Sequence, residues 1–127
     1  LTTNTFGGTR RVLARHGLAE KQAEINRRAA AIAREVAGPG RWVLGDIGPC
    51  GDLLEPYGDV APSELEEDFR DQAAALLEGG ADALLVETMS DPAEAALGVR
   101  AARAAGARVV IATFAFQKTP SGFRTMM

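Results

Sequence analysis

The 127-residue chain carries 14 basic and 17 acidic side chains, a net charge of −3 and 46% hydrophobic residues, which suits one domain with an aliphatic core. No basic tract is longer than Arg10-Arg11 or Arg27-Arg28, and no apolar run approaches the ~20 residues of a membrane span, so neither nucleic acid nor a membrane is an expected partner. Cys50 is the only cysteine, which excludes an internal disulfide and a multi-thiolate metal site built from this chain alone and agrees with a reducing, cytoplasmic location.

Residues 1–6 have the pattern of the tail of a strand, and the chain starts there without a Met, so a natural start at this point is not expected. A helix follows in which apolar residues recur at spacings of three and four. Its predicted buried stripe is Ile25, Ala29, Ile32, Ala33 and Val36. Gly38-Pro39-Gly40 ends this helix, and residues 42–47 are predicted as a strand that Gly48-Pro49 breaks.

A loop rich in Gly, Pro and Asp over residues 51–62 leads to a second predicted helix. Ser63 and Glu66 have the spacing of a reciprocal N-terminal cap, in which each side chain accepts a free backbone N–H. The predicted buried stripe of this helix is Leu65, Phe69, Ala73, Leu76 and Leu77. Gly79-Gly80 ends it, and the continuous apolar run over residues 83–86 is typical of a strand covered on both faces.

Asp91 is the predicted N-cap of a third helix, with Pro92 in its first turn, and this helix is expected to run through Ala105. Residues 109–114 form the last predicted strand. Strands that alternate with helices of this length predict βαβ units and a parallel sheet. Two architectures fit: a small doubly wound sheet, or part of a (β/α)8 barrel, of which a whole one takes ~250 residues.

Polar residues gather where the predicted strands end. These ends lie at residues 3–8, 45–51, 87–91 and 113–116, and they are rich in glycine, carboxylates and small polar side chains. In both architectures, ligands bind at the carboxyl ends of parallel strands. The first strand-to-helix turn has no glycine-rich phosphate-binding fingerprint, which argues against a dinucleotide-binding fold. The strand ends therefore predict a site for a small molecule.

Four motifs in this order and spacing resemble the homocysteine S-methyltransferase family: Thr3-Asn4-Thr5-Phe6, Glu24-Ile25-Asn26, Gly45-Asp46-Ile47-Gly48-Pro49, and the stretch from Gly79 to Asp91 with its Glu87-Thr88-Met89-Ser90. The resemblance covers almost the whole chain. It implies an α/β fold that is a partial (β/α)8 TIM barrel, from about strand 2 to strand 5 with their helices, with residues 1–127 as one incomplete domain. The closing residues 122–127 resemble the lead-in to the sixth unit in the branch that includes corrinoid-linked bacterial enzymes.

The resemblance also implies cofactors and partners. Family members bind zinc through three cysteines that follow the sixth and eighth strands, and the zinc holds the substrate sulfur as a thiolate. None of these cysteines falls within this chain, so the zinc is expected in a complete parent protein, with cobalamin as an alternative methyl carrier. The expected partners are an amino-acid thiol, a methyl donor, and either a corrinoid protein or a complementary half-barrel chain.

Four residues are candidates for substrate binding. By resemblance, Glu87 occupies the position at which the family uses a carboxylate to bind the amino group of the substrate, and a carboxylate at a strand end can pair with an ammonium group. Asn4 and Thr5 either line the pocket or form local turn hydrogen bonds. Asp46 faces either the pocket or a neighbouring backbone. No catalytic residue and no metal ligand is predicted within the chain.

Other conspicuous residues have plainer interpretations. Cys50 does not occupy a metal-ligand position of the family, and we expect a small, semi-buried loop residue. His16, the only histidine, is expected at the surface. Phe114 and Phe116 are expected to pack rather than to meet substrate.

Two functional hypotheses result. In the first, the chain is part of a longer or split zinc-dependent methyltransferase that methylates a thiol such as homocysteine, as in methionine biosynthesis, and is inactive when isolated. In the second, it is a non-catalytic half-barrel that associates with a complementary chain, because a half-barrel leaves two strand edges and one sheet face uncovered. A third interpretation is an independent flavodoxin-like binding domain. It predicts a stable monomer in which Glu87 has no functional role.

Overall fold

The computed structural model describes all residues from 1 to 127. The elements in chain order are helix α1 (Arg10–Ala14), the 3-10 helix η1 (Ala19–Lys21), helix α2 (Gln22–Ala37), strand β1 (Leu44–Ile47), helix α3 (Pro62–Glu78), strand β2 (Ala83–Met89), helix α4 (Pro92–Ala104), strand β3 (Val110–Phe114), and the short strands β4 (Gln117–Thr119) and β5 (Gly122–Arg124). None of the helices is both long and apolar enough to cross a membrane.

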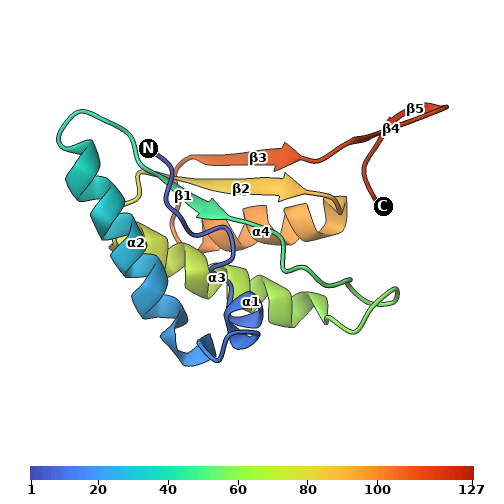
Figure 1. The fold of residues 1–127 in the computed structure, drawn as a ribbon, viewed down its shortest axis with the longest axis horizontal. Coiled ribbons are helices and arrows are strands. Elements are labelled where there is room, and N and C mark those ends of the chain that lie inside the picture. Colours follow the sequence, from blue (N-terminus) through green and yellow to red (C-terminus); the bar gives the residue numbers. More distant parts are fainter.

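The main sheet is parallel and its strands follow the chain order β1-β2-β3. Thr2 adds a parallel bridge to Leu44 on the free side of β1, so residues 1–3 extend the sheet as the strand-like tail that the sequence predicts. Helices α2, α3 and α4 all lie on one face of the sheet (Figure 1). The predicted α/β fold with a parallel sheet is confirmed, and the one-sided arrangement agrees with part of a barrel rather than with a doubly wound sheet, whose helices cover both faces.

The hydrophobic core lies between the sheet and the helices. Phe69 and Leu76 of α3 are fully buried against Leu84 and Val86 of β2. Gly98 of α4 approaches the same strand, since a Cβ there would lie 3.0 Å from Val86. Of the stripe predicted for the second helix, Leu65, Phe69, Ala73 and Leu76 are buried and Leu77 is partly buried, so the periodicity located this face of the helix correctly.

The stripe predicted for the first long helix is only partly correct, because Ile25, Ala29 and Ala33 are partly buried whereas Ile32 and Val36 are exposed. Val36 is 70% exposed and Ile32 is 49% exposed, whereas the buried residues of α2 are Gln22, Asn26, Ala30 and Ala37. The physical reason is the close approach of α2 to α3. A Cβ at Gly79 would lie 2.6 Å from the Cβ of Ala30, so only a face of small side chains fits at this contact. Of the side-chain amides on the same face, Gln22 binds Asp68 of α3 and Asn26 binds the carbonyl oxygen of Gly8.

The cap predicted for the second helix is wrong, whereas the cap of the third is confirmed. Helix α3 starts at Pro62 with Ala61 as its N-cap, which has no side-chain hydrogen bond. Ser63 therefore lies inside the first turn, and Glu66 pairs with Arg100 of α4 instead of reaching back to the helix start. Asp91 does cap α4, because its Oδ1 accepts the backbone N–H of Ala93 at 2.8 Å.

After β3 the chain forms a hairpin that the sequence did not predict. Strands β4 and β5 pair antiparallel, and in Figure 1 they extend away from the body of the molecule. Strand β3 is the exposed edge of the main sheet, with Ile111 42% and Phe114 38% exposed. Phe116 is 59% exposed, and its ring lies beside that of Phe114 at a centroid distance of 6.2 Å, so the two rings lie near each other but neither is part of the buried core of this chain.

The core assignment predicts the effect of two substitutions. Phe69→Ala should lower the free energy of unfolding by about 3–5 kcal/mol, because it leaves a cavity at a fully buried position. Val36→Ala, at a residue that the sequence placed in the core, should change it by no more than about 0.5 kcal/mol, since that side chain is exposed. Urea unfolding of both variants measures the difference. A larger loss for Val36→Ala would mean that α2 packs through the other face.

Candidate functional site

Two carboxylates share the face of the sheet that no helix covers. Gly45 of β1 faces the helices, since a Cβ there would lie 3.1 Å from the Cβ of Leu76, so the next residue, Asp46, points to the opposite face. Asp46 pairs in register with Leu85, and Glu87 lies two residues beyond Leu85 on the same face. Both strands run in the same direction, so Asp46 and Glu87 lie together towards the carboxyl ends of β1 and β2.

Asp46 is a buried carboxyl group in an unfavourable environment for its charge. Its side chain is only 4% exposed, and Oδ1 has no hydrogen-bond partner. Burial, and to a smaller extent the negative charge of Glu87, raise the pKa of Asp46 to about 7, and the hydrogen bond from the backbone N–H of Ile47 acts in the opposite direction. The carboxyl group therefore changes its charge close to neutral pH, and a cation placed beside it would stabilise the ionised form.

Threonine side chains attach the N-terminal segment to β1 next to Asp46. The backbone N–H of Asp46 donates to Thr3 Oγ1 at 2.9 Å, and Thr5 Oγ1 donates to the carbonyl oxygen of Asp46 at 2.6 Å. The two threonine hydroxyls also lie 2.6 Å apart. Thr5 is buried in these hydrogen bonds, whereas Asn4 between the two threonines is exposed. Of this pair, Asn4 is the residue whose side chain is free to meet a ligand.

The backbone immediately after Glu87 is strained. Thr88 has a φ of 58°, in the left-handed region that a β-branched residue rarely adopts, and the pairing of β2 with β3 is irregular between Val86 and Met89. The backbone N–H of Thr88 donates to Thr113 Oγ1 of β3 at 2.9 Å, which helps to hold this conformation. Strain of about 1–3 kcal/mol of this kind is concentrated at functional sites, so its position beside Glu87 supports the choice of this edge.

Three buried polar residues near the strand ends were not among the candidates from the sequence. Asn26 and Gln72 are fully buried on α2 and α3, and Glu94 in the first turn of α4 is 4% exposed. Glu94 Oε1 accepts the backbone N–H of Cys50 at 2.7 Å, and burial raises the pKa of Glu94. A polar residue inside an apolar stripe, such as Gln72 three residues after Phe69, is the signal by which such positions are found in a sequence.

The residues of this chain do not fit a zinc site. No group of three His, Cys, Asp or Glu side chains lies close enough together to hold a metal ion. Cys50 is fully buried rather than semi-buried, and its Sγ donates to the carbonyl oxygen of Asp52 at 3.3 Å. Burial raises the pKa of the Cys50 thiol to about 12, which opposes the thiolate form that binds zinc. His16 is exposed, as predicted.

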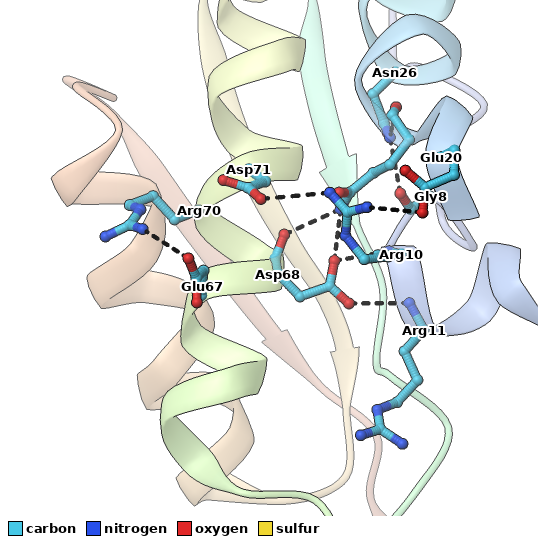
Figure 2. A network of polar contacts seen from close by, with 10 residues as sticks. Gly8, Arg10, Arg11, Glu20, Asn26, Glu67, Asp68, Arg70 and Asp71 are labelled. Atoms are coloured by element: carbon cyan, nitrogen blue, oxygen red, sulfur yellow. Dashed lines mark hydrogen bonds and ion pairs between the residues drawn. The ribbon is translucent and has the colours of Figure 1, made fainter. Parts of the chain in front are cut away.

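A cavity of about 740 Å³ lies between α1 and α3, and neither Asp46 nor Glu87 lines it. Its charges pair with one another: Arg15 lies 2.9 Å from Asp52, and Arg10 lies 3.8 Å from Asp71. Figure 2 shows Asp68 of α3 facing the start of α1, where its carboxylate accepts the backbone N–H groups of Arg10 and Arg11 at 2.7 and 3.0 Å. These contacts join α1 to α3.

Comparison with known proteins identifies the class to which this fold and site belong. The family model described as homocysteine S-methyltransferase matches residues 1–126, so the chain belongs to the homocysteine S-methyltransferase family. Similar proteins include the methionine synthase of Mycobacterium tuberculosis (strain ATCC 25618 / H37Rv), 36% identical over 95 residues, and that of Mycobacterium leprae (strain TN), 37% identical over 95 residues. Each match covers 70% of this chain, but the chain spans only 8% of the length of either relative.

The raised pKa of Asp46 predicts a pH-dependent stability. The folded state holds the Asp46 proton up to about pH 7, whereas the unfolded chain loses it near 3.8, so rising pH destabilises the fold between these values by up to roughly 4 kcal/mol. Asp46→Asn should remove this loss and make the variant more stable than the parent above pH 7. Urea unfolding near pH 5 and near pH 8 measures both proteins, and an equal pH dependence would contradict the assignment.

The environment of Cys50 predicts that its thiol reacts slowly with alkylating reagents. Because burial raises its pKa to about 12, Cys50 should react with iodoacetamide near pH 8 at least about 100-fold more slowly in the folded chain than in concentrated urea. Mass spectrometry of the alkylated cysteine gives both rates. Similar rates in the two conditions would show that the loop after β1 exposes the thiol.

Proposed function

We propose that this chain supplies the substrate-binding edge of a methyltransferase that methylates a thiol acceptor such as homocysteine. The observation that carries the proposal is the pair of carboxylates, Asp46 and Glu87, on one face at the strand ends, where Asp46 Oδ1 has no partner. Family membership and the similarity to two methionine synthases support the class of reaction. Glu87, Asp46 and Asn4 are the proposed substrate-binding residues, and Thr5 supports them by holding the backbone of Asp46 through its hydroxyl.

The carboxylate pair suits the ammonium group of an amino acid. Two carboxylates close together repel each other, and this repulsion is part of the reason that the pKa of Asp46 is raised. An ammonium group bound by Glu87 places a positive charge beside the buried Asp46 carboxyl group and lowers the pKa of that group again. The exposed amide of Asn4 is available to the polar groups of the same ligand. These residues thus bind and orient the acceptor, and orientation alone contributes substantially to rate.

Activation of the sulfur falls to other residues in this proposal. A thiol reacts as its thiolate, and no side chain of this chain fits the zinc set that would stabilise one. We therefore propose that the zinc ligands, and any corrinoid that carries the methyl group, belong to the remainder of a longer or split enzyme in which these strands form part of a (β/α)8 barrel.

The second candidate function, a non-catalytic half-barrel that associates with a complementary chain, is favoured by the open side of β3. Val109 is 52% and Ile111 is 42% exposed. A groove of about 370 Å³ runs between α4 and β3, and it is lined by Pro92, Ala95, Ala96, Val99, Arg100, Ala112 and Phe114. An apolar groove beside an unpaired strand edge suits one further strand and helix. Association without methyl transfer by the assembled protein would favour this candidate over the first.

The role of Glu87 is tested by binding of L-homocysteine to the full chain. Glu87→Gln should raise the dissociation constant about tenfold or more, because it removes a charge-assisted hydrogen bond to the ammonium group. Isothermal titration calorimetry measures the constant. Glu78→Gln is the matched control, because Glu78 is an exposed glutamate that pairs with Arg27 on the helix side.

A second ligand separates recognition of the ammonium group from general damage. 4-Mercaptobutyric acid is homocysteine without its amino group, so its weaker binding should be unaffected by Glu87→Gln. If the substitution weakens both ligands equally, Glu87 does not bind the ammonium group and the proposed site is wrong.

A further inference from the structure

Gln72 is a buried amide that joins the ends of two neighbouring strands. It lies in the middle of α3, fully buried in the stripe that contains Phe69. Its Nε2 lies 2.9 Å from the carbonyl oxygen of Thr5 and 3.4 Å from that of Asp46. A third acceptor, Asn26 Oδ1, lies at 3.1 Å. Because an amide nitrogen has two hydrogens, these three acceptors share the donors, and together they surround the NH₂ group.

The amide occupies the place where the regular strand pairing stops. Residues 1–3 pair with β1 through backbone hydrogen bonds up to Thr3, and backbone contact resumes only where the N–H of Gly48 donates to Phe6 at 3.2 Å. Between these points, Gln72 bridges the Thr5 and Asp46 carbonyl groups. The turn after Thr5 packs directly on this amide, because a Cβ at Gly8 would lie 2.5 Å from Gln72 Nε2.

We propose that Gln72 is a positioning residue of the substrate-binding edge: it sets the position of the Asn4-Thr5 turn relative to Asp46 and does not itself touch the substrate. This inference rests on the proposed function. An apolar side chain of the same volume would fill the space without joining the two strand ends. A carboxylate at this position would have no hydrogen to donate to the three surrounding oxygens. The position therefore requires a side chain with an amide NH₂ group.

Gln22 provides a matched control within the same chain. It is also a buried glutamine, 1% exposed, and its Nε2 donates to Asp68 at the carbonyl oxygen (3.1 Å) and at Oδ1 (2.5 Å). These hydrogen bonds join α2 to α3 and do not involve a strand end. A substitution of Gln22 therefore removes a comparable buried amide from the core and leaves the Asp46 edge in place.

The experiment compares Gln72→Met with Gln22→Met in the full chain. Gln72→Met is expected to fold, because both backbone carbonyl groups that it releases keep another donor: the Gly8 N–H on Thr5 at 2.9 Å, and the Thr5 hydroxyl on Asp46 at 2.6 Å. Only the side-chain Oδ1 of Asn26 loses its donor. Both variants should lower the urea midpoint. Only Gln72→Met should also raise the dissociation constant for L-homocysteine, about tenfold, because a poorly fixed site binds less well.

The pH midpoint of the Asp46 titration, measured by carboxyl ¹³C NMR, separates the two roles. It should change if Gln72 positions the strand end, and it should stay the same if Gln72 only stabilises the core. In Gln72→Met the midpoint should fall towards the ordinary value, because a looser strand end admits water to the carboxyl group. In Gln22→Met the titration midpoint of Asp46 should equal that of the parent chain. Equal effects of the two variants on binding, or an unchanged Asp46 midpoint in Gln72→Met, would overturn the proposal.

Two further outcomes are distinguishable. If the parent chain does not bind L-homocysteine, the proposed function fails, while the Asp46 titration still decides whether Gln72 positions the strand end. If Gln72→Met does not fold, Gln72→Asn takes its place with the same expected split between binding and stability, because its side chain keeps an amide but is too short to bridge both carbonyl groups. Failure of both Gln72 variants to fold, while Gln22→Met folds, would assign Gln72 to stability alone and overturn the positioning role.

Discussion

The fold depends on one topological constraint: every strand–helix–strand connection in the main sheet returns on the same side. Because the parallel strands lie in chain order and such connections share one hand, α3 and α4 must cover one face of the sheet, and α2 joins them there (Figure 1). That face receives the core, with Phe69 and Leu84 among its fully buried residues. The other face receives no helix, and it carries the buried side chain of Asp46 and the partly buried side chain of Glu87.

Helix α3 connects the packing of the core to the strand ends. It packs against α2, α4 and β1, so its residues meet all the neighbouring elements. Phe69 and Leu76 hold it on the sheet, Asp68 caps α1, Glu66 pairs with Arg100 of α4, and Gln72 reaches the strand ends. Since the same helix face carries both the apolar anchors and the amide, the packing of the core and the geometry of the substrate edge are coupled.

The sequence predicted the elements that local chemistry determines. The strands β2 and β3, the helix over residues 92–104 and its Asp91 cap follow from runs of apolar residues and from a capping side chain, and the structure confirms them. The buried face of α2 could not be found in this way, because periodicity favours Ile32 and Val36, whereas the close contact at Gly79 selects Ala30. Only tertiary packing contains that information.

The same distinction applies to the site. The sequence identified Glu87 and Asp46 because parallel strands bring their carboxyl ends to one edge, and the structure places both on one face there. It gave no role to Gln72 and did not consider Glu94, because each binds the backbone of a segment more than 25 residues away, such as the Cys50 N–H. A polar contact over that sequence distance leaves no periodic signal, and its only trace is a polar residue where an apolar one is expected.

The energetics of the carboxylate pair indicate what kind of ligand this edge suits. A buried carboxyl group without a hydrogen bond on one oxygen, next to a second carboxylate, destabilises the fold at neutral pH, and the strained Thr88 beside it adds to that cost. Apolar side chains at these positions would give a more stable sheet. In the proposed function, a cation bound by Glu87 reverses part of this balance, because its positive charge offsets the repulsion between the two carboxylates. We therefore propose that the carboxylate pair selects a ligand with an ammonium group over a neutral one.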